Sequence, residues 1–273
     1  MITDIELAYH AEGWAEEDFV SALRAISGAG FRGVEVVPEI VRSFHDRVLV
    51  FREMLADIDL RLSAVEAVME SLNEENIEEA GLALLRYASF AEQMGAPVLI
   101  VRPPYREKRT VESDEYKVFF GFISEIGKEI LKRGVKLAVR PDVNTIIEKR
   151  TEMAALMKAT PKKSVFLCPD TSHLLTVKVS VETVLKQYKK RIGYVRMLDG
   201  RPRVVLKNEW RRRSPTWRPV GKGKLNVKQI IRTLDKIGFE GWVCASHPPP
   251  VKSADRACEN AMDSLEKALD SLS

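Results

Sequence analysis

Apolar and polar positions alternate along this chain with two different periods. Short apolar runs rich in β-branched residues, typical of buried strands, occur at residues 4–10, 33–38, 61–67, 97–103, 135–141, 164–170, 192–199 and 241–246. Longer stretches of helical period lie between them, and several end in a glycine suited to a left-handed C-cap: 16–30, 75–95, 115–134 and 226–238. Strands that alternate with helices predict a parallel sheet.

The number of these units narrows the fold class. Eight βα units in 273 residues, without a linker-like change in composition, match the size of a single α/β domain, a (β/α)8 TIM barrel over residues 1–273. An open doubly wound sheet is the alternative, but the chain has neither a GxGxxG nor a GxxxxGK[ST] pattern for binding phosphates. In a barrel, we expect the chemistry at the carboxyl ends of the strands.

Composition and cysteine usage indicate the class of protein and its compartment. A chain with 45% hydrophobic and 30% charged residues belongs to the packed globular class. Its three cysteines form no CxxC pair, and no run of 18 apolar residues or signal-like start occurs. These features predict a cytoplasmic protein without disulfides that is not bound to a membrane.

The net charge of +4 is distributed unevenly. The segment from Asp199 to Lys224 has nine Lys and Arg against two acidic residues, a net charge of +7. The basic loop 199–225 is much longer than a usual βα loop, so we expect it to fold over the barrel mouth. Its candidates for contacting an anionic ligand are Arg218, Lys222, Trp210 and Trp217. A solvated basic face or a contact in a homo-oligomer is the alternative.

Polar residues stand at nearly every expected strand end. The candidates for substrate binding there are His10, Glu35, Glu66, Arg102, Arg140 and Arg196. The candidates for proton transfer are Asp142, Asp170, His173 and His247. His45 lies in a helical stretch and is expected at the surface.

Two of these positions, Asp170 and His173, follow the sixth strand three residues apart. They either hold a divalent metal or form an acid/base pair. A loop-capping Asp and a surface His are the alternative.

Two arginines lie inside otherwise apolar strands. The strand period of two directs Arg140 and Arg196 into the barrel, and a buried guanidinium must be paired because it keeps its proton. Asp170, on the strand between them, is the expected partner of both. Such a cluster either binds a carboxylate or phosphate through the two guanidiniums, or only neutralises itself.

Several segments together resemble one known family. They are LAYHAEGW, GFRGVEVVP, RLSAVEA, MGAPVLIVRP, GVKLAVRPD, FLCPDTSHL, GYVRMLDGR and WRPVGKGKLNVKQIIRTLDKIGFEGW. The chain is similar over nearly its whole length to sugar phosphate isomerases/epimerases with the xylose-isomerase-like TIM barrel, including inosose dehydratase and isomerase relatives. The resemblance implies a small polyhydroxylated sugar, sugar acid or sugar phosphate as ligand. It also implies proton transfer next to a carbonyl, as in isomerisation, epimerisation or dehydration.

The resemblance also implies a metal site, which the residues alter. The family usually holds one divalent cation, such as Mn, Mg, Co or Zn, with Glu, Asp, His and Glu from strands five to eight. By position these ligands fall on Arg140, Asp170, Arg196 and Ser246, so Asp170 alone is retained. Two arginines repel a cation, and we therefore expect no cofactor, with the guanidiniums supplying positive charge instead.

Two other functions are alternatives to this metal-free enzyme. A non-catalytic binding or subunit protein with a vestigial site fits the same residues, because a fold does not fix chemistry. Abasic-site endonuclease activity, known in the broader superfamily, needs a rich cluster of His, Asp and Glu for several zinc ions. Four histidines are too few for this, so a nucleic-acid partner is disfavoured.

Overall fold

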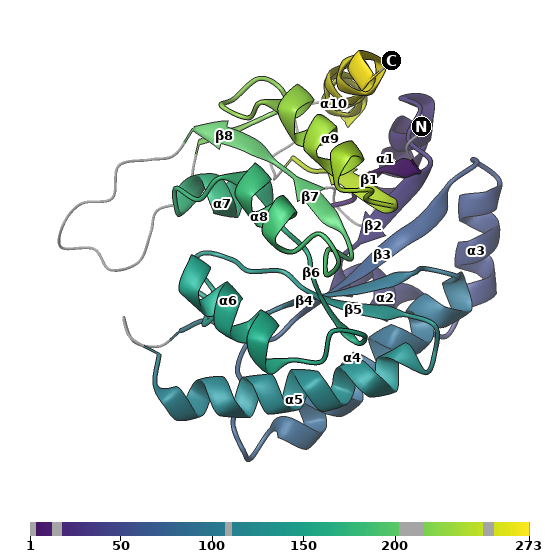
Figure 1. Ribbon diagram of the computed structural model, residues 1–273. Helices are drawn as coiled ribbons and strands as arrows, with labels where there is room; N and C mark the ends of the chain where they lie inside the picture. Colours follow the sequence, from purple (N-terminus) through teal and green to yellow (C-terminus); the bar gives the residue numbers. More distant parts are fainter. Residues whose placement is uncertain (1–3, 13–17, 107–110, 202–215, 248–253, 273) are drawn as a thin grey trace.

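The computed structural model describes residues 4–12, 18–106, 111–201, 216–247 and 254–272 (Figure 1). Eight parallel strands form one sheet in the order β6-β5-β4-β3-β2-β1-β10-β7. Their bounds are β1 (Ile5–His10), β2 (Gly33–Val36), β3 (Arg61–Val68), β4 (Val98–Arg102), β5 (Lys136–Val139), β6 (Val165–Leu167), β7 (Val195–Met197) and β10 (Gly241–Ala245). Each strand coincides with one of the eight predicted runs, so the predicted strand pattern is confirmed.

The sheet closes on itself between its two outer strands. Parallel bridges join Leu167 to Ile192 and Asp170 to Arg196, which connects β6 to the segment that contains β7. The backbone amide of Arg196 donates to the carbonyl oxygen of Pro169 over 3.0 Å. The strands therefore curl into a (β/α)8 TIM barrel, as the sequence predicts.

Helices surround the barrel and follow the strands along the chain (Figure 1). The longer ones are α1 (Phe19–Gly28), α4 (Ile77–Met94), α5 (Ser113–Leu131), α6 (Arg150–Ala159), α9 (Val227–Lys236) and α10 (Ala254–Leu269). Shorter ones are α2 (Pro38–Phe44), α3 (Val48–Ala56), α7 (Thr171–Thr176), α8 (Val181–Gln187) and the 3-10 turn η2 (Asp270–Leu272). The predicted C-cap glycine Gly95 has a φ of 72°, the left-handed conformation that ends α4. Among the described residues, no helix combines the length and the apolar character needed to cross a bilayer.

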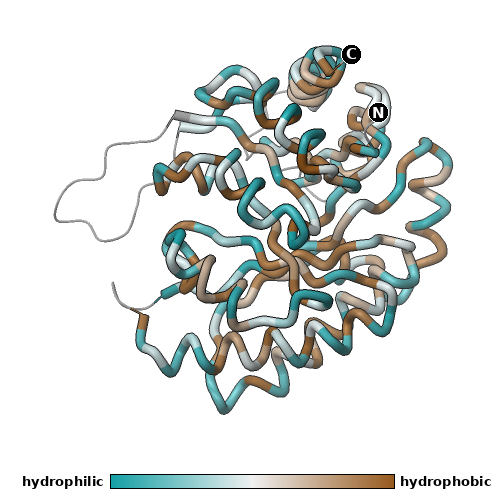
Figure 2. The backbone as a smooth tube through the Cα atoms, viewed as in Figure 1, coloured by the Kyte–Doolittle hydropathy of each residue, from teal (hydrophilic) through white to brown (hydrophobic). Residues whose placement is uncertain are grey.

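Apolar side chains form two separate cores. The larger one fills the space between strands and helices, and the hydropathy colouring of Figure 2 shows apolar residues concentrated at the strands. The smaller one fills the barrel interior with residues at every second strand position: Ala8, Ala64, Val98, Ile100, Ala138, Cys168, Tyr194, Trp242 and Cys244. Gly33 makes room for the indole of Trp242, because a Cβ at that position would collide with the ring. The next inward-facing position along each strand is at the barrel mouth.

The basic loop 199–225 contains structure that the sequence did not predict. Its ends pair as an antiparallel two-stranded sheet of β8 (Asp199–Arg201) and β9 (Thr216–Arg218). Residues 202–215, which include Trp210, lie outside the described residues. The expectation that this loop folds over the mouth can therefore be followed only through β9 and the segment after it.

Candidate active site

Eight side chains, each from a barrel strand or from the one to three residues that follow it, face inward at the mouth. We call them the mouth ring: His10, Glu35, Glu66, Arg102, Arg140, Asp170, Arg196 and Ser246. Most lie two residues beyond a member of the interior core, as Arg140 does beyond Ala138 and Arg196 beyond Tyr194. The period of two along parallel strands therefore brings together residues that are far apart in the sequence.

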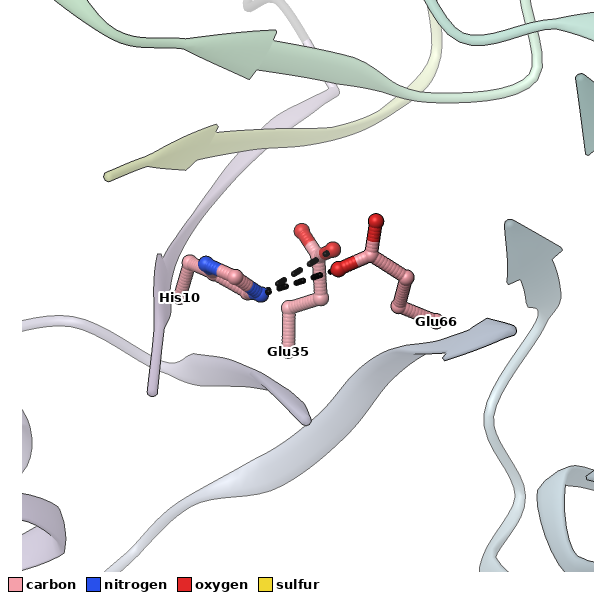
Figure 3. A group of neighbouring side chains, drawn as sticks. All are labelled: His10, Glu35 and Glu66. Carbon is pink, nitrogen blue, oxygen red and sulfur yellow. Dashed lines mark ion pairs between the residues drawn. The ribbon is translucent and has the colours of Figure 1, made fainter. Parts of the chain in front are cut away.

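Three ring members converge from β1, β2 and β3 (Figure 3). The Nε2 atom of His10 lies 3.7 Å from Glu35 Oε1 and 3.5 Å from Glu66 Oε2, and all three side chains are buried. Their candidate ligand atoms lie within 4.8 Å of one another. An imidazole and two carboxylates at such spacing form a donor set that attracts a cation.

The guanidinium of Arg196 lies among these three donors. Its Nη2 atom donates to Glu35 Oε1, lies 3.1 Å from Glu66 Oε2 and lies 3.4 Å from His10 Nε2. The other nitrogen of the imidazole, Nδ1, is 3.3 Å from Glu12 Oε2. Hydrogen bonding to His10 lowers the pKa of Glu12 to about 2. One nitrogen of Arg196 thus contacts every donor of the trio.

Arg140 pairs with a second set of carboxylates. Its Nη2 atom lies 2.9 Å from Glu66 Oε1, and its Nη1 atom lies 3.2 Å from Asp170 Oδ2 and 3.3 Å from Asp142 Oδ2. Burial alone would lower the pKa of Arg140, but these carboxylates raise it well above its usual value. Burial likewise works to raise the pKa of Glu66, and Arg140 and His10 outweigh it and lower that pKa. Arg140 and Glu66 therefore stay ionised as a buried pair.

The expectation that Asp170 pairs with both arginines holds for Arg140 only. Asp170 caps α7, where its Oδ1 atom accepts hydrogen bonds from Ser172 Oγ over 2.6 Å and from the amides of Ser172 and His173 over 2.9 and 3.3 Å. Capping directs this carboxylate towards its own helix. Arg196 instead reaches Glu35 and Glu66 across the barrel, a pairing that the order of strands along the chain does not suggest.

His173 is buried, which excludes the surface alternative for this residue. Its Nε2 atom lies 2.8 Å from the carbonyl oxygen of Glu148, so Nε2 carries the proton and Nδ1 is a free acceptor. Within the described part of the chain, Nδ1 has no hydrogen-bond partner. Burial lowers the pKa of His173, which favours the neutral ring.

A cavity of about 340 Å³ lies at the barrel mouth and is lined in part by the mouth ring. Of the predicted site residues, its lining includes Arg102, Arg140, Asp142, Asp170, His173 and Arg196. The trio of His10, Glu35 and Glu66 lies beneath the lining, where it holds the arginines rather than facing a ligand. His247 is half-buried, and Arg218 and Lys222 are exposed; none of these three is among the described residues that line the cavity.

Sequence reasoning missed several lining residues. Glu12 follows His10 by two residues, so the strand period could have indicated it. Tyr105, Asn144, Ser172 and Thr176 lie on loops and short helices, where no such signal exists. Trp217, a predicted ligand contact of the basic loop, lines the cavity from β9, although its charged neighbour Arg218 does not.

The buried Asp199 fixes the segment that follows β9. Its carboxylate accepts hydrogen bonds from five backbone amides, those of Gly200, Gly221, Gly223, Lys224 and Leu225. A Cβ at Gly223 would collide with this carboxylate, so the position needs glycine. Asp199 thereby anchors the end of the basic loop next to the mouth.

Fold and site together define a barrel with a polar pocket at the carboxyl ends of its strands. A model of the xylose isomerase-like TIM barrel family matches residues 23–270. The chain belongs to this family. It is 24% identical to an inosose dehydratase of Clostridium botulinum over 259 residues, 85% of each chain.

Solved structures show the same fold at low sequence identity. A crystal structure described as IOLI protein with a binding zinc atom superposes with a TM-score of 0.80 and 16% identity, covering 97% of this chain and 98% of that one. D-allulose 3-epimerase from Methylomonas sp., in complex with D-allulose, superposes with a TM-score of 0.79 and 12% identity over 97% of each chain.

Proposed function

We propose that this protein is a sugar isomerase, epimerase or dehydratase that moves a proton next to the carbonyl of a small polyhydroxylated ligand, and that it does so without the family's divalent metal. The ligand binds in the mouth cavity and bears one anionic group. A cavity of about 340 Å³ suits a molecule of monosaccharide size, since ligand sites typically occupy roughly 300–1,000 Å³.

The position of Arg196 Nη2 carries the metal-free part of the proposal. It contacts His10, Glu35 and Glu66 at once, which is where a cation would bind to this trio. At the four family ligand positions, two guanidiniums and a hydroxyl accompany Asp170, and this donor set does not fit Zn²⁺ or Mn²⁺.

The proposed reaction needs a proton acceptor and groups that stabilise an enolate-like oxygen. His173 Nδ1 is unprotonated, lacks a described partner and belongs to a residue that lines the cavity, so it takes the proton from the carbon next to the carbonyl. Arg140 and Arg196 lower the energy of the negative oxygen that forms. The His173 imidazolium then returns the proton to the neighbouring carbon or to a departing hydroxyl, and Asp142, which also lines the cavity, stays a predicted proton-transfer residue.

The names of similar proteins support this class of reaction. The chain is similar in sequence to an inosose dehydratase and in fold to a D-allulose 3-epimerase, two enzymes named for polyhydroxylated carbonyl compounds. Asp170 and His247 stay predicted proton-transfer residues of lower rank. Asp170 already accepts several hydrogen bonds, and His247 is not a described lining residue.

Solvent-deuterium exchange followed by NMR tests the proposal. The protein is incubated in D₂O with D-fructose 6-phosphate or 5-keto-D-gluconate, which combine a carbonyl with an anionic group, and with excess EDTA, and we expect deuterium at the carbon next to the carbonyl. His173→Gln should slow the exchange by about 10²- to 10⁴-fold. His45→Gln, which changes an exposed histidine far from the mouth, should leave it unchanged.

Two results would contradict the proposal. Exchange that disappears in EDTA and returns with a divalent metal contradicts the metal-free part. Binding of these compounds without any exchange favours the alternative function, a binding protein with a vestigial active site.

A further inference from the structure

The three arginines of the mouth ring differ in how their charge is balanced. Arg140 pairs with three carboxylates and Arg196 with two. Among the described residues, Arg102 forms no ion pair, and its Nε atom is buried without a hydrogen-bond partner. The carboxylates of the ring are thus shared by two arginines, and the third keeps its charge unbalanced.

Arg102 is held in a geometry suited to binding an oxyanion. Its Cζ atom lies 4.9 Å from the centre of the Tyr105 ring, so the aromatic face covers one side of the guanidinium. Stacking leaves the N–H donors at the edge of the plane free to bind a carboxylate or phosphate through two parallel bonds.

The loop that carries Tyr105 is fixed in place. Tyr105 forms an isolated β-bridge with Thr145, and the amide of Arg106 donates to the carbonyl oxygen of Asn144 over 2.8 Å. The backbone that carries the Tyr105 ring is therefore held next to the cavity that this residue lines.

The remaining charges of the cavity direct an anion to the same place. Glu12, Asp142 and Asp170 also line the cavity, and Glu66 lies just beneath it. An anionic group placed next to these residues is repelled by their carboxylates. These carboxylates instead accept hydrogen bonds from hydroxyl groups of a ligand. One end of the cavity thus suits hydroxyls, and the Arg102 end suits a negative charge.

We infer that Arg102, stacked on Tyr105, binds the terminal carboxylate or phosphate of the ligand. The other polar residues that line the cavity contact its hydroxyl and carbonyl groups. The inference rests on the proposed function for the rest of the ligand. It names the substrate class as a sugar acid or sugar phosphate rather than a neutral sugar. Arg140 and Arg196 are not the anion subsite, because their charges are already matched.

Calorimetric titrations with paired probes test this inference. The pairs are D-gluconate with D-glucitol, and D-glucose 6-phosphate with D-glucose, so that each pair differs by one anionic group. We expect Arg102→Gln to weaken binding of the anionic members by about 10- to 100-fold and to change the neutral members less than about 2-fold. The pair whose anionic member loses more affinity shows whether a carboxylate or a phosphate is the preferred group.

A matched control comes from the other end of the barrel. Arg61 is also stacked on an aromatic ring, that of Trp242 at 5.1 Å, and Arg61→Gln removes the same charge far from the mouth. It should leave all four affinities unchanged. Tyr105→Leu keeps the charge of Arg102 and removes the aromatic ring stacked on it, so it should weaken binding of the anionic probes by only about 2- to 5-fold.

Several outcomes would overturn the inference. They are equal losses for charged and neutral probes, an Arg102→Gln variant that binds the anions as tightly as the wild type, and a wild type that binds neither anion at millimolar concentration. Failure of the proposed function is a separate result: anion binding that depends on Arg102, without deuterium exchange, keeps this subsite and rejects the proton transfer.

Discussion

In the part of the chain that the structure describes, two buried clusters of arginine and carboxylate differ in how completely their hydrogen bonds are satisfied. In the first cluster Arg106 lies 2.9 Å from Glu152 and 3.5 Å from Glu148, and its Nε atom donates to the carbonyl oxygen of Thr145. Glu152 also accepts hydrogen bonds from the amides of Glu148 and Lys149 at the start of α6. This cluster joins a loop to a helix.

The second cluster is the mouth ring, where polar atoms lack partners. Within the described residues, the Nε atoms of Arg102, Arg140 and Arg196 and the Nδ1 atom of His173 are buried without hydrogen bonds, and all four residues line the cavity. An unsatisfied buried polar atom costs roughly 1–3 kcal/mol. A satisfied ion cluster supports the fold, whereas one with unused donors beside a cavity is suited to bind a ligand.

The largest effect on stability is expected from the satisfied cluster. Arg106→Met removes the buried cation that Glu148 and Glu152 share and leaves Glu152 only the half-exposed Lys149 at 3.8 Å, so the free energy of unfolding should fall by about 3–5 kcal/mol. Chemical denaturation measures this change. Deuterium exchange per folded molecule should stay near the wild-type rate, and a loss of exchange in folded protein would break the distinction between the clusters.

Arg196→Met should reduce the rate of deuterium exchange more than it reduces stability. Glu35 and Glu66 keep His10 nearby, and Glu66 also keeps Arg140, so the loss of stability should be smaller, about 1–3 kcal/mol. Exchange should slow by about 10²- to 10³-fold, because the group that stabilises the negative oxygen is gone. A variant that is strongly destabilised but exchanges normally when folded would place Arg196 with the structural cluster.

Asp199 provides a structural comparison at the edge of the mouth. Asp199→Ala leaves five backbone amides without their acceptor and should cost about 1–3 kcal/mol. Hydrogen exchange at the amides of Gly221, Gly223, Lys224 and Leu225 should accelerate first, since these amides lose their acceptor. Unchanged protection there would show that Asp199 does not anchor the segment.

A smaller effect is expected in the pH dependence. The pKa of His173 is lowered from 6.5 by burial, so below pH 6.5 the unfolded chain takes up a proton that the folded protein does not. Stability should therefore decline as the pH falls through 6.5, and the decline should be weaker in His173→Gln. Because Nδ1 stays free of a proton, the acid limb of kcat/KM should lie below pH 6.5; a limb at or above 6.5 argues against His173 as the base.

Much of the fold could be predicted from the sequence, because period and position carry the information. β-branched runs such as 97–103 and 135–141 form strands where they were expected. The rule that barrel chemistry lies at strand ends selected ring members such as His10 and Glu66. These residues come together because inward positions of parallel strands repeat every two residues, a regularity that is visible in the sequence.

The pairing within the site could not be predicted in the same way. Asp170 is adjacent to Arg196 in strand order, but its carboxylate is committed to α7 through Ser172 and His173. The partner of Arg196 is Glu35, from a strand on another side of the barrel. Such contacts depend on side-chain length and direction across the interior, which strand order does not encode.

The central claim is that Arg196 and Arg140 fill the place of the family's cation. Calorimetric titration of Mn²⁺ into the metal-stripped wild type tests it most directly, with the triple variant Arg140→Glu, Arg196→His, Ser246→Glu as comparison. We expect no saturable binding by the wild type up to about 1 mM, a limit of roughly −4 kcal/mol, and tighter binding by the triple variant. Stoichiometric, saturable binding of Mn²⁺ by the wild type would contradict the account.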